Sequence, residues 1–314
     1  MENSLTITEG QAIQSIGLER IEHLVERFIA DQDVKPQSRN AYRRTIRQFF
    51  LWIERKGFDL RSLTRSEILQ YKNALQAEGK SSLTAASYLT SVKLFYAWLE
   101  ALKIYPNIAR GVRMPKRIQQ HKKQPLTSSQ STELLAHFKA QARRDYAIVN
   151  LLLRTGLRTI EVIRADVNDL TTKGGRKVLM VQGKGRDEKD AFVILTDKAY
   201  QPIADYLTER NAQSGEPLFI SESNNNGGGR LTTRTISFLA KEGLKAIGLN
   251  DKAYTAHSLR HTTAVSILRA GGTIEDAQGI LRHSSPATTQ IYTATIKEER
   301  RLERASEALI DSLY

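Results

Sequence analysis

A chain of 314 residues is long enough for two domains with a buried core in each, which excludes a peptide hormone, a disulfide miniprotein and an isolated DNA-binding motif. Hydrophobic residues make up 40% and charged residues 26%, the balance of an ordinary globular protein, and the absence of cysteine excludes disulfides, thiolate nucleophiles and Cys-ligated zinc. Lys and Arg number 47 against 34 Asp and Glu, and the net charge of +13 predicts a polyanionic partner, with nucleic acid as the first candidate.

The N-terminus has the character of neither a signal peptide nor a membrane anchor. Residues 1–17 carry acidic side chains and no apolar core of signal-peptide length, and no uncharged apolar run of 18 residues occurs in the chain. We therefore expect a cytoplasmic, nucleoid-associated protein without a membrane span. Because residues 1–17 also lack a helical or strand pattern, they are expected to form a loose tail.

Residues 18–105 have the periodicity of a helical bundle. Apolar residues recur at intervals of three and four, and Thr64 and Glu67 have the spacing of a capping box. The second helix has one apolar face and one basic face. The expected helices cover residues 18–30, 36–56, 65–77 and 82–103. The basic residues of the second helix, which are candidate DNA contacts, are Arg39, Arg43, Arg44 and Arg47.

A basic linker is predicted over residues 106–125. Between residues 101 and 132 there are seven Lys or Arg residues, three prolines and no acidic residue. Because the segment joins two domains of positive charge, we expect it to lie along nucleic acid through Arg113, Lys116 and Arg117. A solvated charge run is the alternative interpretation.

Residues 126–314 are predicted to form a second, mixed domain. Two short strands, Val178–Val181 and Ala191–Leu195, flank the turn GKGRDEK, and the rest has helical periodicity. The expected helices cover a stretch ending at Gly156, then residues 159–164, 197–210, 232–247 after the loop NNNGGG, and 257 to the C-terminus. The predicted fold class is mainly α with a small β-sheet, an α+β architecture.

The candidate chemistry of this domain is cationic. HSLRH at residues 257–261 and LRHSSPATTQIYT at residues 281–293 bring histidines and arginines together, a composition that attracts phosphate and repels Mg²⁺ or Zn²⁺. No metal-ligand cluster and no nucleotide-binding loop is present, so neither a metal nor a cofactor is expected. TGLRTIEV places Arg158 in an apolar helical setting, where Glu161 is a candidate partner for its charge.

Four segments in this order, TGLRTIEV, GKGRDEK, HSLRHTTA and LRHSSPATTQIYT, resemble the motifs of the tyrosine recombinases, also called phage integrases. The resemblance extends from residue 18 to the C-terminus, with nine positions from His283 to Tyr292. It implies a helical core-binding domain over residues 18–105 and a catalytic domain over residues 126–314 with a C-terminal docking helix. Arg282 departs from the family, which usually has glycine there, and we expect a surface adjustment at this position.

The resemblance also implies a role for each site residue. Tyr292 is the expected nucleophile, and Lys184 the expected acid for the 5′ oxygen, with Lys177 and Lys189 as alternatives on the same hairpin. Arg158 and Arg260 are expected to bind the phosphate, because each guanidinium offers a planar fork to two oxygens. The remaining candidates are His257, which exchanges a proton with Tyr292 or donates to the phosphate, His283 as a hydrogen-bond donor to the phosphate, Glu161 as an orienting group and His261 as a packing residue.

We interpret the chain as a site-specific DNA recombinase that acts through a 3′-phosphotyrosine and a Holliday junction, without metal or nucleotide. The expected partner is a double-stranded DNA core site with inverted repeats. A homotetramer is expected to assemble on this DNA, so the free protein can be a monomer. Since only about 17 residues precede the bundle, we expect a simple two-domain recombinase, similar to chromosome or plasmid resolving enzymes or to those of mobile elements. An apolar stripe is the expected docking surface, formed by Leu302, Ala305, Leu309, Ile310 and Leu313.

Two other functions stay open at this point. A type IB topoisomerase-like enzyme uses the same chemistry to nick and reseal one strand as a monomer, without a docking helix. A non-catalytic DNA-binding regulator needs positive charge but no positioned phenol. The C-terminal helix also has an alternative to docking, because it can fold back on its own domain.

Overall fold

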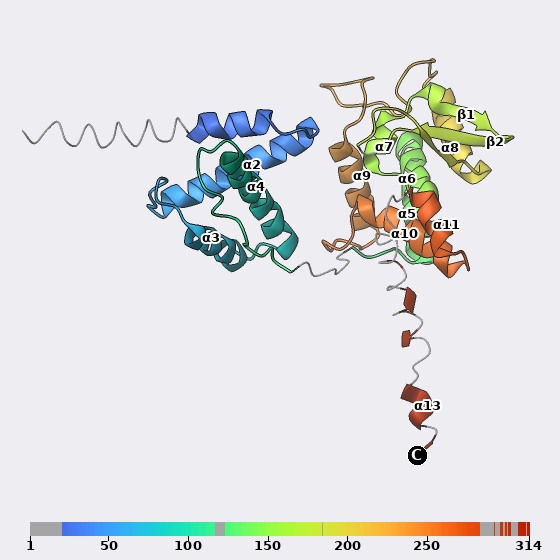
Figure 1. Cartoon of the computed structure of the whole chain (residues 1–314). Coiled ribbons are helices and arrows are strands. Elements are labelled where there is room, and N and C mark those ends of the chain that lie inside the picture. The colour runs from blue at the N-terminus through green and yellow to red at the C-terminus, as the bar shows by residue number, and fades with distance from the viewer. Residues whose placement is uncertain are drawn as a thin grey trace, which may run out of the picture. The chain divides into compact units, whose positions relative to one another are not determined.

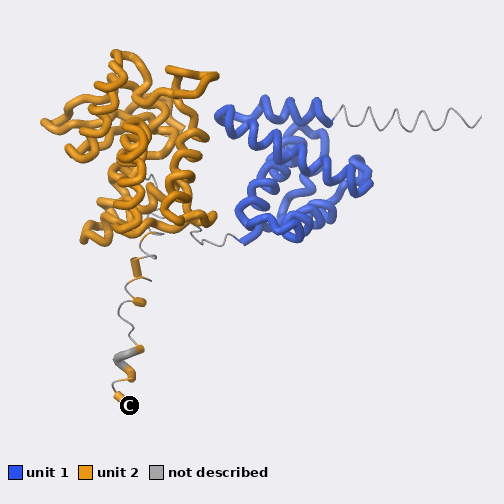
Figure 2. The backbone as a smooth tube through the Cα atoms, turned by 180° about the vertical axis from the view of Figure 1, so that it is seen from behind, with its two compact units in different colours: residues 1–120 blue, residues 121–314 orange. Residues whose placement is uncertain are grey.

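In the computed structural model the chain divides into two compact units, the N-terminal unit (residues 1–120) and the C-terminal unit (residues 121–314) (Figure 2). The structure describes residues 21–116, 123–183, 185–282, 292, 296, 297, 299, 301, 302, 307–311, 313 and 314. Several predictions from the sequence fall outside these described residues: the tail at 1–17, the start of the first helix at 18–20, Arg117, Lys184, His283 and Ala305. Within the described part of the chain, no helix is long and apolar enough to cross a membrane.

The N-terminal unit is a bundle of helices, as the sequence predicts (Figure 1). The start of the third helix confirms the predicted capping box, because the Thr64 amide donates to the Glu67 carboxylate at 2.6 Å while the Thr64 hydroxyl accepts from Ser66. Among the described residues of this unit, the helices cover residues 21–30, α2 (Pro36–Arg55), α3 (Arg65–Ala77) and α4 (Ser82–Ala101).

Aromatic side chains fill the core of the N-terminal unit. Phe28 meets Phe95 edge to face with ring centroids 5.4 Å apart, and Phe49 meets Tyr71 at 5.0 Å. A buried hydrogen bond of 2.5 Å between the hydroxyls of Thr45 and Ser91 joins α2 to α4. These contacts hold α2 and α4 in one arrangement, which matters for the surface between them.

The C-terminal unit packs helices around one central helix, α6, which contacts α5, α8 and α10. The predicted helical stretch that ends at Gly156 is two helices, α5 and α6. In chain order the helices are α5 (Ser128–Lys139), α6 (Arg143–Thr155), α7 (Thr159–Arg164), the 3₁₀ turn η1 (Val167–Asp169), α8 (Asp197–Glu209), α9 (Thr233–Ala246), α10 (Ala256–Arg269), α11 (Ile274–Leu281) and α13 (Glu307–Asp311).

The sheet is antiparallel with the order β1 (Leu170–Lys173), β2 (Arg176–Val181) and β3 (Ala191–Ile194). β2 and β3 confirm the two predicted strands, whereas β1 was not predicted. β1 joins β2 through a two-residue turn in which Gly174 and Gly175 have positive φ angles of 55° and 73°. Positive φ at both positions suits a tight hairpin, and glycine adopts it without strain.

Gly156 allows a close approach between segments in the C-terminal unit. It ends α6 with a φ of +59°, and a Cβ added there would lie 2.6 Å from the Leu281 side chain and 3.3 Å from Thr263. The Thr263 hydroxyl donates to the Leu153 carbonyl at 2.8 Å, so a hydrogen bond also joins α10 to the end of α6. A residue without a side chain is needed here both for the backbone and for the packing.

We predict that Gly156→Ala lowers the free energy of unfolding by about 2–4 kcal/mol, because left-handed strain adds to overpacking against Leu281. Gly248→Ala is the matched control, since Gly248 has a φ of +82° but open space around it, and should cost only about 1 kcal/mol. Scanning calorimetry measures both. Equal losses in the two variants would show that the close approach is not a constraint.

Candidate active site

Arg260 lies inside the C-terminal unit, where only 2% of it is exposed. Its guanidinium donates to the Gly156 carbonyl at the end of α6 and to the Leu281 carbonyl at the end of α11, the latter at 2.5 Å. Burial and the neighbouring Arg158 lower its pKa to about 10, which still leaves it charged at neutral pH. A buried cation without a full counter-charge is a site that an anion can occupy.

Glu161 is the acid of this site and is 1% exposed. One carboxylate oxygen accepts from the Arg158 side chain at 2.9 Å, and the other accepts from the Arg158 amide at 2.7 Å and from Arg282 at 2.8 Å. Burial by itself would raise the pKa of Glu161, but Arg282, Arg158 and Arg260 together hold it below its ordinary value. The predicted pairing of Arg158 with Glu161 is therefore present, and Glu161 pairs with a second cation, Arg282.

The expectation of a surface adjustment at Arg282 is wrong. Its side chain is 16% exposed and donates to Glu161 and, at 2.7 Å, to the Ile280 carbonyl. Arg282 ends α11 in the left-handed conformation with φ +52°, ψ +47°, which is a natural position for glycine. The sequence shows that position 282 departs from the usual glycine. Only the fold shows that the end of α11 lies beside α7, where Arg282 contacts Glu161.

Tyr292 and His261 lie against each other. Tyr292 is 2% exposed and packs with Val265 and Leu281, and its ring centroid is 4.7 Å from that of His261. Burial raises the pKa of the Tyr292 phenol, while Arg260 and Arg158 act in the opposite direction. The phenol therefore belongs to the same electrostatic site as the two arginines.

The two histidines of HSLRH occupy different environments one helical turn apart. His257 lies in the first turn of α10 and is exposed, whereas His261 is buried beside Tyr292. The burial of His261 fits a packing residue beneath the site. The exposure of His257 leaves it able to meet a bound substrate.

Lys177 and Lys189, the two described lysines near the hairpin, have different contacts. Lys189 lies between two carboxylates, 2.6 Å from Asp166 and 2.5 Å from Asp169, and these hydrogen bonds outweigh burial and raise its pKa. The Lys177 ammonium stacks over the Tyr200 ring, 3.9 Å from its centroid. Both alternatives to Lys184 as the acid are thus held elsewhere.

The basic face of α2 is divided in the structure. Arg43 and Arg47 pair with Glu26 of the helix at 21–30, at 2.8 and 3.2 Å, and Arg39 donates to the Gln32 carbonyl at 2.9 Å. Arg43 and Arg47 attach α2 to the first helix and Arg39 attaches it to the loop that follows, contacts that the sequence did not indicate. Arg44 instead is exposed and lines a hollow between α2 and α4.

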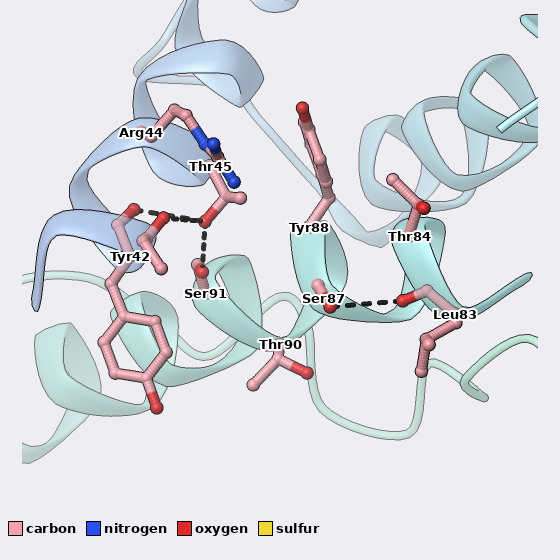
Figure 3. Close-up of a pocket in the computed structure, with 10 residues that line it drawn as sticks. Tyr42, Arg44, Thr45, Leu83, Thr84, Ser87, Tyr88, Thr90 and Ser91 are labelled. Atoms are coloured by element: carbon pink, nitrogen blue, oxygen red, sulfur yellow. Dashed lines mark hydrogen bonds between the residues drawn. The ribbon is translucent and has the colours of Figure 1, made fainter. Parts of the chain in front are cut away.

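This hollow has a volume of about 410 Å³ (Figure 3). Figure 3 shows the side chains of Arg44 and Tyr88 beside it, near the Thr45–Ser91 hydrogen bond that joins the helices. The other residues that line the hollow are uncharged: Ala41, Tyr42, Leu83, Thr84, Ser87 and Thr90. Of the linker candidates within the described residues, Arg113 and Lys116 are both exposed.

Family models match both units. The phage integrase family model covers residues 124–299, and the SAM-like N-terminal domain of phage integrases covers residues 21–103. The chain belongs to the phage integrase family. This membership and the relatives confirm the predicted family and the predicted function class, a site-specific DNA recombinase that breaks and rejoins DNA strands.

Curated relatives of this integrase are tyrosine recombinases over most of their length. XerC of Leptospira interrogans (serogroup Icterohaemorrhagiae serovar copenhageni, strain Fiocruz L1-130) is 30% identical over 269 residues, which cover 83% of each chain. XerD of Listeria monocytogenes (serotype 4b, strain F2365) is 28% identical over 292 residues, covering 88% of this chain and 94% of XerD.

Solved structures share the fold of this integrase. XerH site-specific recombinase, bound to palindromic difH substrate after cleavage, has a TM-score of 0.70 at 19% identity, covering 85% of this chain and 78% of XerH. The Tn1549 transposon integrase bound to transposon right end DNA has a TM-score of 0.68 at 20% identity, covering 88% of this chain and 98% of that one. The likeness confirms the predicted fold class, a helical N-terminal part followed by an α+β part.

Proposed function

We propose that the protein cleaves DNA with Tyr292 and carries the broken strand as a 3′-phosphotyrosine. The observation that carries this proposal is that the Tyr292 ring packs against His261 and Leu281, beside Arg260, and that its phenol lies in the field of Arg158 and Arg260. A phenol positioned among cations is suited to attack a phosphodiester. A DNA-binding regulator would need the charge but not the phenol.

The proposed reaction conserves the energy of the phosphodiester bond. The phenolic oxygen of Tyr292 attacks phosphorus, the bond to the 5′ oxygen breaks, and a 3′-phosphotyrosine and a 5′ hydroxyl result. His257 takes the phenolic proton, and Lys184 supplies a proton to the departing oxygen. Attack by the 5′ hydroxyl of another strand reverses these steps and rejoins the DNA through a Holliday junction.

Positioned cations lower the barrier of this reaction, because the transition state carries more negative charge than the diester. Arg260 is anchored by two carbonyls, and Arg158 is 31% exposed, so the pair offers one fixed and one accessible guanidinium. We assign both to the non-bridging oxygens, with His283 as a further donor. All these groups are supplied by the chain, so the proposed reaction needs neither metal nor nucleotide.

We further propose that the hollow between α2 and α4 meets the DNA duplex, with Arg44 as its cation. Arg44 is exposed there, whereas Arg43 and Arg47 pair with Glu26 of the first helix and Arg39 donates to the Gln32 carbonyl. The exposed Arg113 and Lys116, with Arg117, continue the phosphate contacts along the linker. The protein would then act at the nucleoid, where its core site lies.

A homotetramer on paired core sites is the proposed active assembly, because two exchanging duplexes require four active sites. The apolar side chains of Leu302, Ile310 and Leu313 are 79%, 55% and 75% exposed, which favours docking onto a second copy over folding back on the same domain. The same exposure favours recombination over topoisomerase-like nicking and closing, which a monomer can perform.

Tyr292→Phe should abolish covalent attachment, reducing cleavage at least about 10⁴-fold, because it removes only the nucleophilic oxygen from a buried ring. The substrate is a nicked suicide form of the core site that the protein selects from random-sequence duplexes, and the adduct is measured on denaturing gels. Tyr206→Phe, which removes another buried hydroxyl, should keep cleavage. An adduct that survives in Tyr292→Phe would reject the nucleophile.

Lys184→Ala should slow cleavage of a normal phosphate about 10²-fold or more and recover on a 5′-bridging phosphorothiolate, because sulfur leaves without a proton. Lys177→Ala is the control from the same hairpin and should cleave both substrates like the parent protein. Single-turnover rates on the two substrates measure the effect. A Lys184→Ala defect of equal size on both would move the role of acid to another group.

Truncation after Ala294 should leave binding to a single core half-site nearly intact, while cooperative filling of paired sites and recombination are lost. Burying each large apolar side chain of the tail contributes about 1.5–3 kcal/mol, which matters once DNA concentrates the partners. The triple variant L302S/I310S/L313S keeps the chain length and should have the same effect. Gel shifts and thermal melting measure both, and loss of monomer stability with all DNA binding would mean that the tail folds on its own domain.

A further inference from the structure

Glu161 lies between two guanidiniums that come from distant parts of the chain. Arg158 precedes α7, and Arg282 follows α11, yet both donate to the same carboxylate, at 2.9 and 2.8 Å. Glu161 is 1% exposed, so water contributes little to its solvation. The carboxylate therefore depends on these two arginines for compensation of its charge.

The charge balance of the site depends on Arg282. Arg158, Arg260 and Arg282 are three cations around the single carboxylate of Glu161, a net charge of +2. With glycine at position 282 the net charge would be +1, and Arg158 would be the one guanidinium left hydrogen-bonded to Glu161 among the described residues. Less positive charge would then be available to the scissile phosphate.

Arg282 is held in place by the protein itself. One terminal nitrogen donates to Glu161 and the other to the Ile280 carbonyl at 2.7 Å, so both are committed to protein acceptors. Its backbone adopts φ +52°, a conformation that costs an arginine more than a glycine. The chain thus keeps this side chain in spite of a conformational cost.

We propose that Arg282 is a positioning residue that neutralises Glu161 and leaves the charge of Arg158 for the scissile phosphate. Arg282 acts through Glu161, since its own terminal nitrogens are occupied, whereas Arg158 is 31% exposed and is the guanidinium that a phosphate can reach. The inference rests on the proposed function, in which Arg158 and Arg260 bind the phosphate.

The first test is Arg282→Gly in single-turnover cleavage of the nicked core site. Glycine accepts the positive φ, so the backbone conformation should persist. Loss of the buried ion pair with Glu161 should lower the melting temperature, so cleavage is compared well below the melting temperature of both proteins. We expect cleavage to slow about tenfold to a hundredfold, with DNA affinity within about twofold of the parent protein. Arg282→Lys, which keeps the charge without the planar fork, should recover part of the rate.

The decisive test is the double variant R282G/E161Q. Glutamine keeps an oxygen that accepts from the Arg158 amide but removes the negative charge that Arg282 neutralises. The double variant should therefore cleave about tenfold faster than Arg282→Gly alone, a coupling that a merely structural role would not produce. A double variant as slow as the product of the two single defects, or an Arg282→Gly protein with the parent rate, would overturn the inference.

These results can be separated from a failure of the proposed function. An adduct at Tyr292 in the parent protein, combined with a parental rate for Arg282→Gly, would reject the role of Arg282 and leave the proposed function standing. Absence of any tyrosyl adduct in the parent protein would reject the proposed function and the role of Arg282 with it.

Discussion

A buried arginine organises the C-terminal unit. Arg260 places a full charge in the protein interior, which is unfavourable unless polar groups surround it. The carbonyls of Gly156 and Leu281 meet that need, and both have lost their helical partners because they lie at helix ends. One guanidinium therefore ties the ends of α6 and α11 to the middle of α10. The same group is the fixed cation of the proposed active site, so the packing of these helices and the chemistry depend on one side chain.

Carboxylates decide which cations of the C-terminal unit are available to a substrate. Lys189 has two acidic partners, Asp166 and Asp169, and is fully committed to the structure of the hairpin. At the proposed active site the ratio is reversed, because a single carboxylate, that of Glu161, accepts hydrogen bonds from two guanidiniums. An excess of cations over acids is costly in the free protein, and an incoming phosphate relieves it. The site thus holds the positive charge that the proposed reaction needs.

The N-terminal unit shows the same distribution of roles among its arginines. A face of four arginines on one helix suggests a uniform DNA-binding surface, but Glu26 engages two of them and a backbone carbonyl of Gln32 a third. Arg44 points into the hollow between α2 and α4, whose geometry is set by the buried Thr45–Ser91 hydrogen bond. Positive charge on this helix therefore serves the assembly of the bundle as well as the DNA contact that we propose for Arg44.

The sequence by itself determined the features that depend on near neighbours. Helix periodicity, the Thr64 capping box and the i,i+3 pair of Arg158 and Glu161 are encoded in residue spacing, and the order of the motifs was enough to predict the family. β1 was missed because its residues are mostly exposed and lack alternation, leaving only the Gly174–Gly175 turn as a signal. Tertiary structure alone decided that Arg282 reaches Glu161, that Arg260 reaches the carbonyl of Gly156 and that Glu26 engages α2. The partners in these contacts are far apart along the chain, and no local pattern specifies which distant segments will pack together.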